Sequence, residues 1–379
     1  MLIYRTAGES HGKCVLALVE GFPAAVEIDK GSIDRELRRR QGGYGRGARM
    51  AIERDRVEIL SGTRADVTLG SPITLLIQNR DYKIEELPEV TRPRPGHADL
   101  AGMLKFLTPD ARPILERSSA RETAARTAAG ALAKILLAQF DISVLAFVVQ
   151  IGKAKAKASK LSPEEMVKIR KRSPVYTLDR SAERSMIAEI DRAKAHGDTL
   201  GGVFEVVATG VPAGLGSTAQ WSQRLDGRLA QALMSIQGIK AVEIGAGFKA
   251  ASLPGSRVHD QIFYNAKSHE KSGGFYRRTN RAGGIEGGIT NGQPVICRAA
   301  MKPISTLKEP LRSVDVRTKE AVEAQVERSD VCAVPAASVV GEAAVAFELA
   351  RAFLEKFAGD SLPEIKQNYQ KFLAAWKEL

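Results

Sequence analysis

Arginine and glycine alternate in one stretch whose composition suits the binding of anions. Residues 38–50 read RRRQGGYGRGARM, with five arginines among four glycines. A guanidinium stays protonated in water and presents a planar fork of N–H donors, while glycine allows close approach of the backbone. These properties suit a phosphate or polycarboxylate ligand. The alternative is a solvated basic loop, which is weakened because similar clusters recur at 92–99, 116–126 and 327–330.

Two histidines lie on turns that could aim them into a cleft. His11 belongs to the glycine-bracketed turn TAGESHG (6–12), and His97 belongs to TRPRPGHAD (91–99), which two prolines stiffen. Histidine has a reference pKa of about 6.5, so it can exchange a proton near neutral pH. Either ring could therefore be aimed into a cleft and exchange a proton there. For His11 the alternative is a turn histidine that faces water.

The start of a long apolar helix is a further candidate anion site. ERSSARETAAR (116–126) precedes TAAGALAKILLAQF (127–140). The pattern predicts a helix capped by Ser118 or Ser119, with Glu122 as the partner in a capping box. Free N–H groups at the helix start, two hydroxyls and Arg117 or Arg121 would together attract an anion. The alternative is a plain capping box with arginines in solvent.

The last third of the chain adds two polar segments. Residues 277–306 contain two Gly pairs that could lie against a flat ligand, and Lys302 to Thr306 offer an ammonium and two hydroxyls for a phosphate. The segment 326–335 adds Arg328 and Asp330. For both segments an ordinary polar surface loop is the alternative.

Short strands and two buried helices must position these groups. We expect a helix over 32–40, capped by Ser32 and ended by Gly42 and Gly43 in the left-handed conformation. The apolar stretches 127–140 and 339–357 should be buried on most faces, which favours a helical layer covered by sheets. A capping box at 361–364 should open a helix that packs through Ile365, Tyr369, Phe372 and Trp376. The predicted strands are 2–5, 15–20, 57–60, 73–78, 143–151, 202–209 and 242–244.

Composition excludes several classes of protein. The chain has 379 residues, 44% hydrophobic and 26% charged, as in ordinary globular proteins, and a net charge of +12. Residues 153–172 hold eight Lys/Arg against two Glu, so this run alone contributes 8 − 2 = +6. We interpret it as a solvated face or flexible excursion, with a capping box at 162–165. Three scattered cysteines predict no disulfide framework and no metal site, and they favour a reducing compartment. We expect neither a signal peptide nor a membrane span.

The residues alone suggest two rival classes of protein, and each has a weakness. The basic charge and the Arg/Gly loop suggest a nucleic-acid-binding protein, but aromatic residues make up only 6% of the chain and no RNA-binding motif occurs. GLGSTA (214–219) and GAGFKA (245–250) match the G-x-G-x-x-A pattern of an NADPH-dependent oxidoreductase. Neither lies in a clear βαβ unit with an acidic residue about twenty positions on, so we reject both.

With these segments in view, the chain resembles the chorismate synthase family. The resemblance spans nearly the whole chain in order, outside 153–172 and the last twenty residues. In two places it departs from the family pattern: Gln237-Gly238 stands where Asn-Ala is common, and Val331 stands where proline often follows the aspartate. The matching motifs are GESHG (8–12), RRRQGGYGRGARM (38–50), RPGHAD (94–99), ERSSARET (116–123), GGVFEVVATGVPAGLGS (201–217), ALMSIQGIKAVEIG (232–245), GGIEGGITNGQP (283–294), MKPIST (301–306) and ERSD (327–330).

The resemblance implies a fold, a reaction and a cofactor. The fold would be α+β, a single-domain β-α-β sandwich over residues 1–379 with a helical layer between antiparallel sheets, assembled as a homotetramer. The reaction would be the 1,4-elimination of phosphate from 5-enolpyruvylshikimate-3-phosphate, which gives chorismate and is the last step of the shikimate pathway. It would require reduced FMN without net redox change, in the cytoplasm. A separate system would reduce the flavin, and whether NADPH contacts this chain is left open.

The resemblance also implies roles for individual residues. His11 resembles the acid that protonates the departing phosphate, and His97 the group that protonates or polarises the flavin. Asp330 resembles the carboxylate that helps the flavin N5 take up the substrate proton. The remaining histidines, His196, His259 and His269, match no such motif and are interpreted as surface residues. The implied substrate-binding residues are Ser10, Arg40, Arg46, Arg49 and Arg121. The implied flavin-binding residues are Arg117, Ser118, Ser119, Gln237, Gly238, Gly287, Lys302, Pro303, Ile304, Ser305, Thr306 and Arg328.

Overall fold

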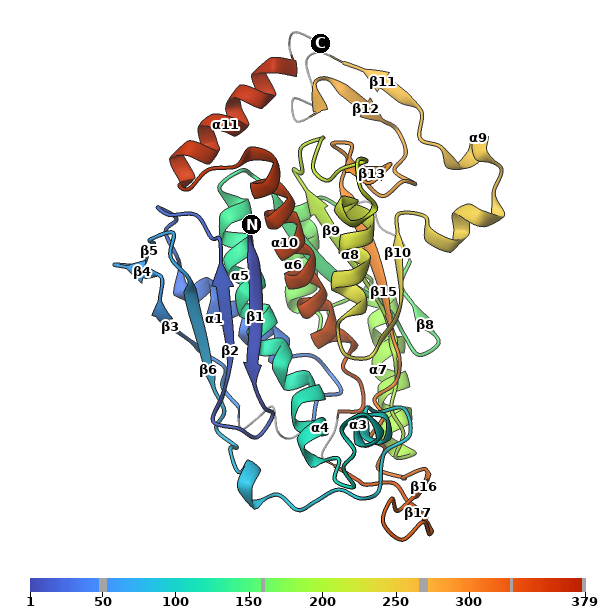
Figure 1. Ribbon diagram of the computed structural model, residues 1–379. Coiled ribbons are helices and arrows are strands. Elements are labelled where there is room, and N and C mark those ends of the chain that lie inside the picture. Colours follow the sequence, from blue (N-terminus) through green and yellow to red (C-terminus); the bar gives the residue numbers. More distant parts are fainter. Residues whose placement is uncertain (48–52, 158–160, 266–271, 328–329, 377–379) are drawn as a thin grey trace.

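Two antiparallel sheets enclose a layer of helices in the computed structural model of the protein (Figure 1). The structure describes residues 1–47, 53–157, 161–265, 272–327 and 330–376. This arrangement confirms the predicted α+β class, in which helices lie between antiparallel sheets.

The first sheet has four strands in the order β1-β2-β6-β3, and every pair is antiparallel. Alternate residues of β6, namely Ile73, Leu75 and Ile77, are buried, as expected of a sheet with one face on the core. The strands are β1 (Ile3–Gly8), β2 (Cys14–Glu20), β6 (Ile73–Gln78) and β3 (Val57–Ser61). The turn between β1 and β2 carries Ser10 and His11.

The second sheet has five strands in the order β10-β15-β9-β7-β8, again antiparallel throughout. Strands β7 and β9 have the bounds predicted from the sequence, whereas β10 begins three residues earlier than expected. On β9, Phe204, Val206 and Ala208 are buried toward the helices. The strands are β10 (Ile239–Ile244), β15 (Val295–Met301), β9 (Gly202–Thr209), β7 (Ser143–Ile151) and β8 (Ala154–Lys155).

The helical layer depends on the close approach of small residues. A Cβ atom added to Gly130 would lie 2.4 Å from Cβ of Ala343, and one added to Gly341 would lie 2.3 Å from the ring of Phe204. Helix α10 therefore packs tightly both on α5 and on the second sheet, and it is buried on nearly all faces, as predicted. It begins five residues before the expected start at 339. The layer consists of α1 (Lys30–Gln41), α5 (Thr123–Ala138), α8 (Leu225–Met234) and α10 (Val334–Phe357).

The start and end of α1 differ from the prediction. Asp29, not Ser32, is the N-cap, because its carboxylate accepts the N–H of Gly31 at 2.8 Å while the Ser32 hydroxyl donates to the same carboxylate. The helix does end before Gly42, but Gly42 is extended with φ −76°, and the left-handed residue is Gly43 with φ +103°. The chain therefore turns away one residue later than expected.

The segment before α5 is not one continuous helix. Helix α4 (Arg112–Ser118) is followed by a 3-10 turn, η2 (Ala120–Glu122), and only then by α5. Ser119 caps that short turn by accepting the N–H of Arg121, so the predicted capping box for the long helix is wrong. The Glu122 side chain instead bonds Thr6, Arg126 and Gln237.

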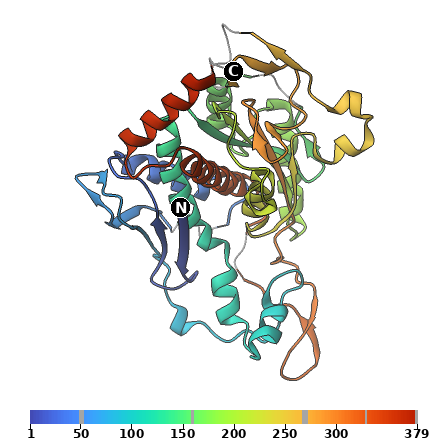
Figure 2. The same ribbon diagram turned by 45° about the horizontal axis from the view of Figure 1, so that its top comes forward.

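Helices α3 and α4 and the β16–β17 hairpin extend from one end of the sandwich in both views (Figures 1 and 2). Ser361 makes no capping hydrogen bond from its side chain at the start of α11, so the capping box predicted there is wrong, although Ile365 and Tyr369 are buried as expected. Further elements outside the helical layer and the two large sheets are α3 (Asp99–Phe106), α11 (Leu362–Ala375), β16 (Arg312–Val314), β17 (Ala321–Glu323), β11 (Ile262–Tyr264), β12 (Phe275–Arg277), β13 (Ile285–Glu286), β14 (Ile289–Thr290), β4 (Thr63–Arg64), β5 (Val67–Thr68), α9 (Gly255–Val258), η1 (Ile84–Glu86), η3 (Trp221–Gln223) and η4 (Gly247–Ser252).

The basic run is only partly a solvated face. Its helix, α6 (Pro163–Arg172), has the predicted capping box at Ser162 and Glu165. Arg170, however, is buried and donates to Glu342 of α10 at 2.8 Å, because a fully buried carboxylate requires a cation. The helix α7 (Arg180–Ala195) follows.

All three cysteines are free, as the spacing predicted. Among the residues that the structure describes, no helix has the length and apolar character needed to cross a bilayer.

Candidate active site

A cavity of about 470 Å³ opens where the loops of both sheets meet the ends of α1, α5 and α10. Its walls come from segments that are far apart in the sequence, so only the folded chain brings them together. The lining includes Ser10, His11, Arg40, Arg46, Gly47, Arg94, Gly96, His97, Ala98, Leu115, Ser118, Ser119, Ala120, Arg121, Thr123, Ile236, Gln237, Gly238, Met301, Lys302, Pro303, Ile304, Ser305, Thr306, Glu327, Asp330, Ala333, Ala336, Ala337 and Val340.

Most site residues predicted from the sequence line this cavity. Arg117 and Gly287 do not, and Arg49 and Arg328 lie outside the described residues. The predicted residues that the cavity gathers are Ser10, His11, Arg40, Arg46, His97, Ser118, Ser119, Arg121, Gln237, Gly238, Lys302, Pro303, Ile304, Ser305, Thr306 and Asp330. Their roles as catalytic, substrate-binding or flavin-binding groups stay predictions.

His11 is held by a buried carboxylate from α4. Its Nδ1 lies 2.9 Å from Glu116 Oε1, and its backbone N–H donates to Glu116 Oε2 at 2.7 Å. Burial by itself would raise the pKa of Glu116, but the two hydrogen bonds from His11 and the charge of Arg112 lower it below its ordinary value. On the same turn, the Ser10 hydroxyl accepts from Ser119 at 3.1 Å, which joins the turn to the start of η2.

Arg40 and Arg121 share one buried carboxylate, Asp55. Arg40 Nη2 donates to Asp55 Oδ2 at 3.0 Å, and Arg121 Nη1 donates to Asp55 Oδ1 at 2.6 Å. Burial lowers the pKa of Arg40 to about 10 against the opposing charge of Asp55, and the like charge of Arg121 contributes to the lowering. Asp55 thus fixes two guanidinium groups at the cavity wall.

Arg46 and Asp330 form an ion pair in the lining of the cavity. Arg46 Nη1 donates to Asp330 Oδ2 at 2.5 Å, and the N–H of Gly47 donates to Oδ1 at 2.6 Å. The Gly-rich loop after α1 is therefore fastened to the segment that leads into α10. This pair joins a residue predicted to bind substrate to one predicted to be catalytic.

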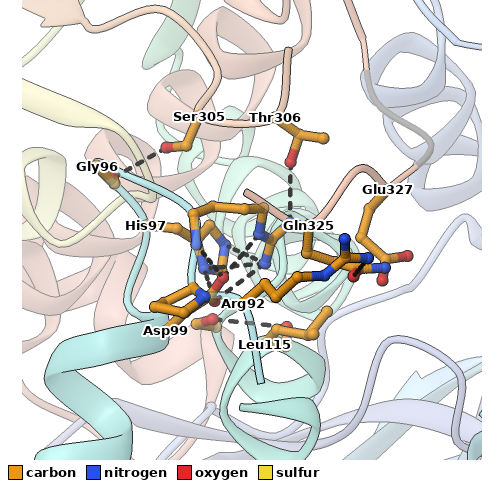
Figure 3. Close-up of polar contacts among 12 residues, drawn as sticks. Arg92, Gly96, His97, Asp99, Leu115, Ser305, Thr306, Gln325 and Glu327 are labelled. Carbon is orange, nitrogen blue, oxygen red and sulfur yellow. Dashed lines mark hydrogen bonds and ion pairs between the residues drawn. The ribbon is translucent and has the colours of Figure 1, made fainter. Parts of the chain in front are cut away.

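His97 belongs to a compact group in the proline-stiffened loop before α3. Its Nδ1 contacts Asp99 Oδ1, and Arg94 donates to the same carboxylate through Nε at 2.8 Å and Nη2 at 3.0 Å. Arg94 Nη1 continues to the Thr306 hydroxyl at 2.9 Å (Figure 3). Burial would raise the pKa of Asp99, but the bonds from His97 and Arg94 lower it well below the usual range.

Residues 302–306, which are hydrogen-bonded to the His97 loop, offer donors of the kind that bind phosphate. Lys302 Nζ donates to the Gly96 carbonyl at 2.8 Å and to the Ser305 hydroxyl at 2.7 Å. Ser305 also donates to that carbonyl (Figure 3). Burial, followed by the charge of Lys240, lowers the pKa of Lys302. Within the described part of the chain, the buried Gln237 Oε1 has no hydrogen-bond partner, so it can accept an N–H from a ligand in the cavity.

Two predicted flavin-binding residues lie elsewhere. Arg117 extends along β1 and donates to the carbonyls of Gly8 at 2.8 Å and Thr6 at 2.9 Å. Gly287 forms the β13–β14 turn with φ +59°, and its carbonyl accepts from Arg224 at 3.2 Å. Neither lines the cavity of this chain.

The sequence analysis missed the buried carboxylates that support the site. Glu116 stood inside the motif ERSSARET, and Asp99 was seen only as a neighbour of His97; neither was assigned a role. Asp55 had no local signal, because its partners lie 15 and 66 residues away in the chain. A carboxylate directly before an Arg-Ser-Ser segment was the one clue that could have singled out Glu116.

Guanidinium groups, hydroxyls and two histidine–carboxylate pairs around one cavity, within an antiparallel β-α-β sandwich, define an enzyme that acts on a small molecule. Comparison with known proteins identifies the family. The family model "Chorismate synthase" matches residues 2–354. The chain is 58% identical to chorismate synthase of Desulforamulus reducens, with 97% of each chain covered. It is 57% identical to that of Moorella thermoacetica, with 100% of this chain and 99% of the relative covered.

A solved structure supports the same assignment. A crystal structure of chorismate synthase, 42% identical, superposes with a TM-score of 0.82 and covers 100% of this chain and 99% of the other. The chain belongs to the chorismate synthase family, and it is therefore an enzyme of the lyase class.

Proposed function

We propose that the protein converts 5-enolpyruvylshikimate-3-phosphate to chorismate and phosphate by a 1,4-elimination that depends on reduced FMN without net redox change. The observation that carries the proposal is one cavity whose lining includes three arginines, Arg40, Arg46 and Arg121, together with Lys302 and Ser305. A phosphorylated dicarboxylate and a flavin phosphate together require that many cationic and polar donors. Each charge-assisted hydrogen bond contributes roughly 1.5–3 kcal/mol.

In this proposal the protein binds, orients and moves protons. Arg40, Arg46, Arg49 and Arg121 hold the substrate with Ser10, and His11 gives a proton to the departing phosphate. Asp330 supplies a carboxylate for the proton that the substrate loses, and His97 protonates or polarises the flavin. The remaining predicted residues hold the flavin: Arg117, Ser118, Ser119, Gln237, Gly238, Gly287, Lys302, Pro303, Ile304, Ser305, Thr306 and Arg328.

The residues present fit a flavin. The unpartnered Gln237 Oε1 suits a flavin N–H, and the ammonium and hydroxyls of 302–306 suit its phosphate. When bound, reduced FMN supplies an electron that can be lent to the allylic phosphate and recovered, which no side chain in these motifs can do. The protein then has to exclude water and oxygen and neutralise the phosphate charge.

The proposal extends to the whole protein. The chain acts as one catalytic domain in a cytoplasmic homotetramer, a separate system reduces the flavin, and any NADPH requirement belongs to that system. Neither nucleic acid nor membrane is a partner.

Anaerobic turnover assays test the reaction. With reduced FMN we expect one phosphate released per chorismate formed and flavin still reduced at the end; oxidised or absent FMN should give no turnover. Stoichiometric oxidation of the flavin would instead indicate an oxidoreductase. Flavin-independent RNA binding that weakens steeply with salt, without turnover, would support a nucleic-acid-binding protein.

A further inference from the structure

Glu116 binds His11 through both of its oxygen atoms. Oε2 accepts the backbone N–H of His11 at 2.7 Å, while Oε1 lies 2.9 Å from the ring Nδ1. The Glu116 side chain is 0% exposed, and that of His11 is 13% exposed. The backbone carbonyl of Glu116 also accepts the N–H of Ser10 at 3.0 Å, so the whole residue is fitted to the turn.

This geometry selects one form of the imidazole ring. An ionised carboxylate only accepts hydrogen bonds, so Nδ1 must carry a proton. Nε2 is then the ring nitrogen that can meet a ligand in the cavity that His11 lines. Among the described residues, the other charged group paired with Glu116 is Arg112, whose Nη1 is 3.7 Å from Oε1 and whose Nη2 donates to Glu327 at 3.0 Å. Glu116 therefore keeps most of its negative charge for His11.

We propose that Glu116 is a positioning residue for His11: it fixes the proton on Nδ1, turns Nε2 toward the bound anion, and balances the charge of the ring when Nε2 is protonated. The proposal rests on the proposed role of His11 as the acid for the departing phosphate. It assigns a task in proton transfer to Glu116, the first residue of ERSSARET.

The variant Glu116→Gln separates charge from shape. The backbone N–H of His11 still needs an acceptor, so the amide oxygen should take the Oε2 position and the NH₂ group the Oε1 position. That NH₂ lies at the position 2.9 Å from Nδ1 and can only donate to it, which favours a neutral ring with its proton on Nε2 over the longer, 3.1 Å contact between Nδ1 and the amide oxygen. The wrong tautomer should lower kcat by roughly 10²–10⁴-fold while KM changes less than about threefold. Glu116→Asp, which keeps the charge, should recover part of kcat.

The ring itself is observed by ¹⁵N NMR of histidine-labelled protein, with the His11→Ala spectrum for assignment. We expect wild-type His11 to be protonated at Nδ1 when neutral and Glu116→Gln to shift the proton to Nε2. Asp260→Asn is the matched control, since Asp260 is also 0% exposed and accepts backbone N–H groups, from Arg281 and Ala282, remote from the cavity. It should change neither kcat nor the His11 signals.

Two results would overturn the proposal. A wild-type His11 that is neutral with its proton on Nε2 would do so without any variant, even if Glu116→Gln failed to fold. Full kcat in Glu116→Gln would do so as well. Failure of the proposed function looks different: wild-type protein would not turn over with reduced FMN, yet the ring would still show the Nδ1 proton and the shift in Glu116→Gln.

Discussion

The two histidine–carboxylate pairs of the cavity contain the same groups but differ in how the carboxylate is shared. Glu116 bonds His11 twice, and Arg112 comes no nearer than 3.7 Å. Asp99 accepts three hydrogen bonds from Arg94, including its backbone N–H at 3.1 Å, in addition to its contact with His97. The first carboxylate therefore serves the histidine, whereas the second serves a buried arginine first.

The difference has consequences for charge. A proton on His11 makes the His11–Glu116 pair neutral. Arg94 and Asp99 already balance each other, so a proton on His97 leaves that group with a net positive charge. Such a contrast is expected if His11 delivers a proton to phosphate and His97 polarises a flavin. In that case Glu116 supports the chemistry of the site, whereas Asp99 mainly supports its structure.

Removing each histidine should give the largest effect. General acid catalysis contributes roughly 10²–10⁴-fold, so His11→Ala and His97→Ala should each lose kcat in that range while substrate binding changes little. Steady-state kinetics with reduced FMN and a substrate titration measure the two quantities. His196→Ala is the control, because that ring is exposed and, among the described residues, bonds the Arg192 carbonyl at the end of α7. If neither cavity variant folds, the histidines are structural and the comparison collapses.

Removing the charge of Asp99 should cost more stability than removing that of Glu116. Asp99→Asn leaves the buried Arg94 guanidinium without its counter-charge, which we expect to lower the free energy of unfolding by about 3–5 kcal/mol. Glu116→Gln can keep both contacts to His11 as an amide, so its loss should stay below about 2 kcal/mol. Urea unfolding of the flavin-free proteins measures both. Equal losses would mean that the two carboxylates do the same work.

The sequence predicted the residues of the cavity better than their partners. Ser10, His11 and His97 lie on turns marked by glycine and proline, and such local signals survive without tertiary information. The supporting roles of Asp55 and Glu116 were not predicted, because the groups that pair with a buried carboxylate come from other elements of the fold. Arg170 shows the same limit: it stands in a run of surface charge, yet Glu342, 172 residues away, draws it into the interior.

A third cation–carboxylate pair, Arg46 with Asp330, should matter for catalysis and not for folding. Arg46→Ala removes one charge-assisted contact to the substrate and should lower kcat/KM by about 2–3 kcal/mol, or 30- to 150-fold. The Gly-rich loop that carries it is not part of the core, so the unfolding transition should stay near that of the wild type. Arg35→Ala removes an exposed ion pair to Asp29 and serves as the control. Full activity in Arg46→Ala would refute the proposed role of Arg46 in binding the substrate.

The pH dependence of stability should show the same contrast on a smaller scale. The pKa of Glu116 is lowered in the folded state, so its stabilisation is complete above the unfolded pKa of about 4.3 and is lost as pH falls through the folded pKa. Each unit of lowering corresponds to about 1.4 kcal/mol. The stability gap between wild type and Glu116→Gln should therefore narrow between pH 7 and pH 3. Because the pKa of Asp99 is lowered further, the gap for Asp99→Asn should persist to lower pH. If the difference in the free energy of unfolding between wild type and Glu116→Gln instead widened as the pH falls, the prediction would be wrong.

The smallest effect on activity and stability is expected for the exposed charges of the basic run. Lys153, Lys155 and Lys157 are all exposed in the basic run, and changing the three together to Ser should leave kcat/KM within a factor of a few and stability within about 1 kcal/mol. Arg170→Ser, from the same run, should instead destabilise the protein by several kcal/mol, because Glu342 then loses a buried cation and keeps Arg39 and Lys134. Activity assays and urea unfolding of both variants decide the point. A large loss of activity in the triple Lys variant would mean that these exposed lysines contribute to the site, as part of a lid or of a route for the substrate. Burial alone would then not determine which charges are needed for activity.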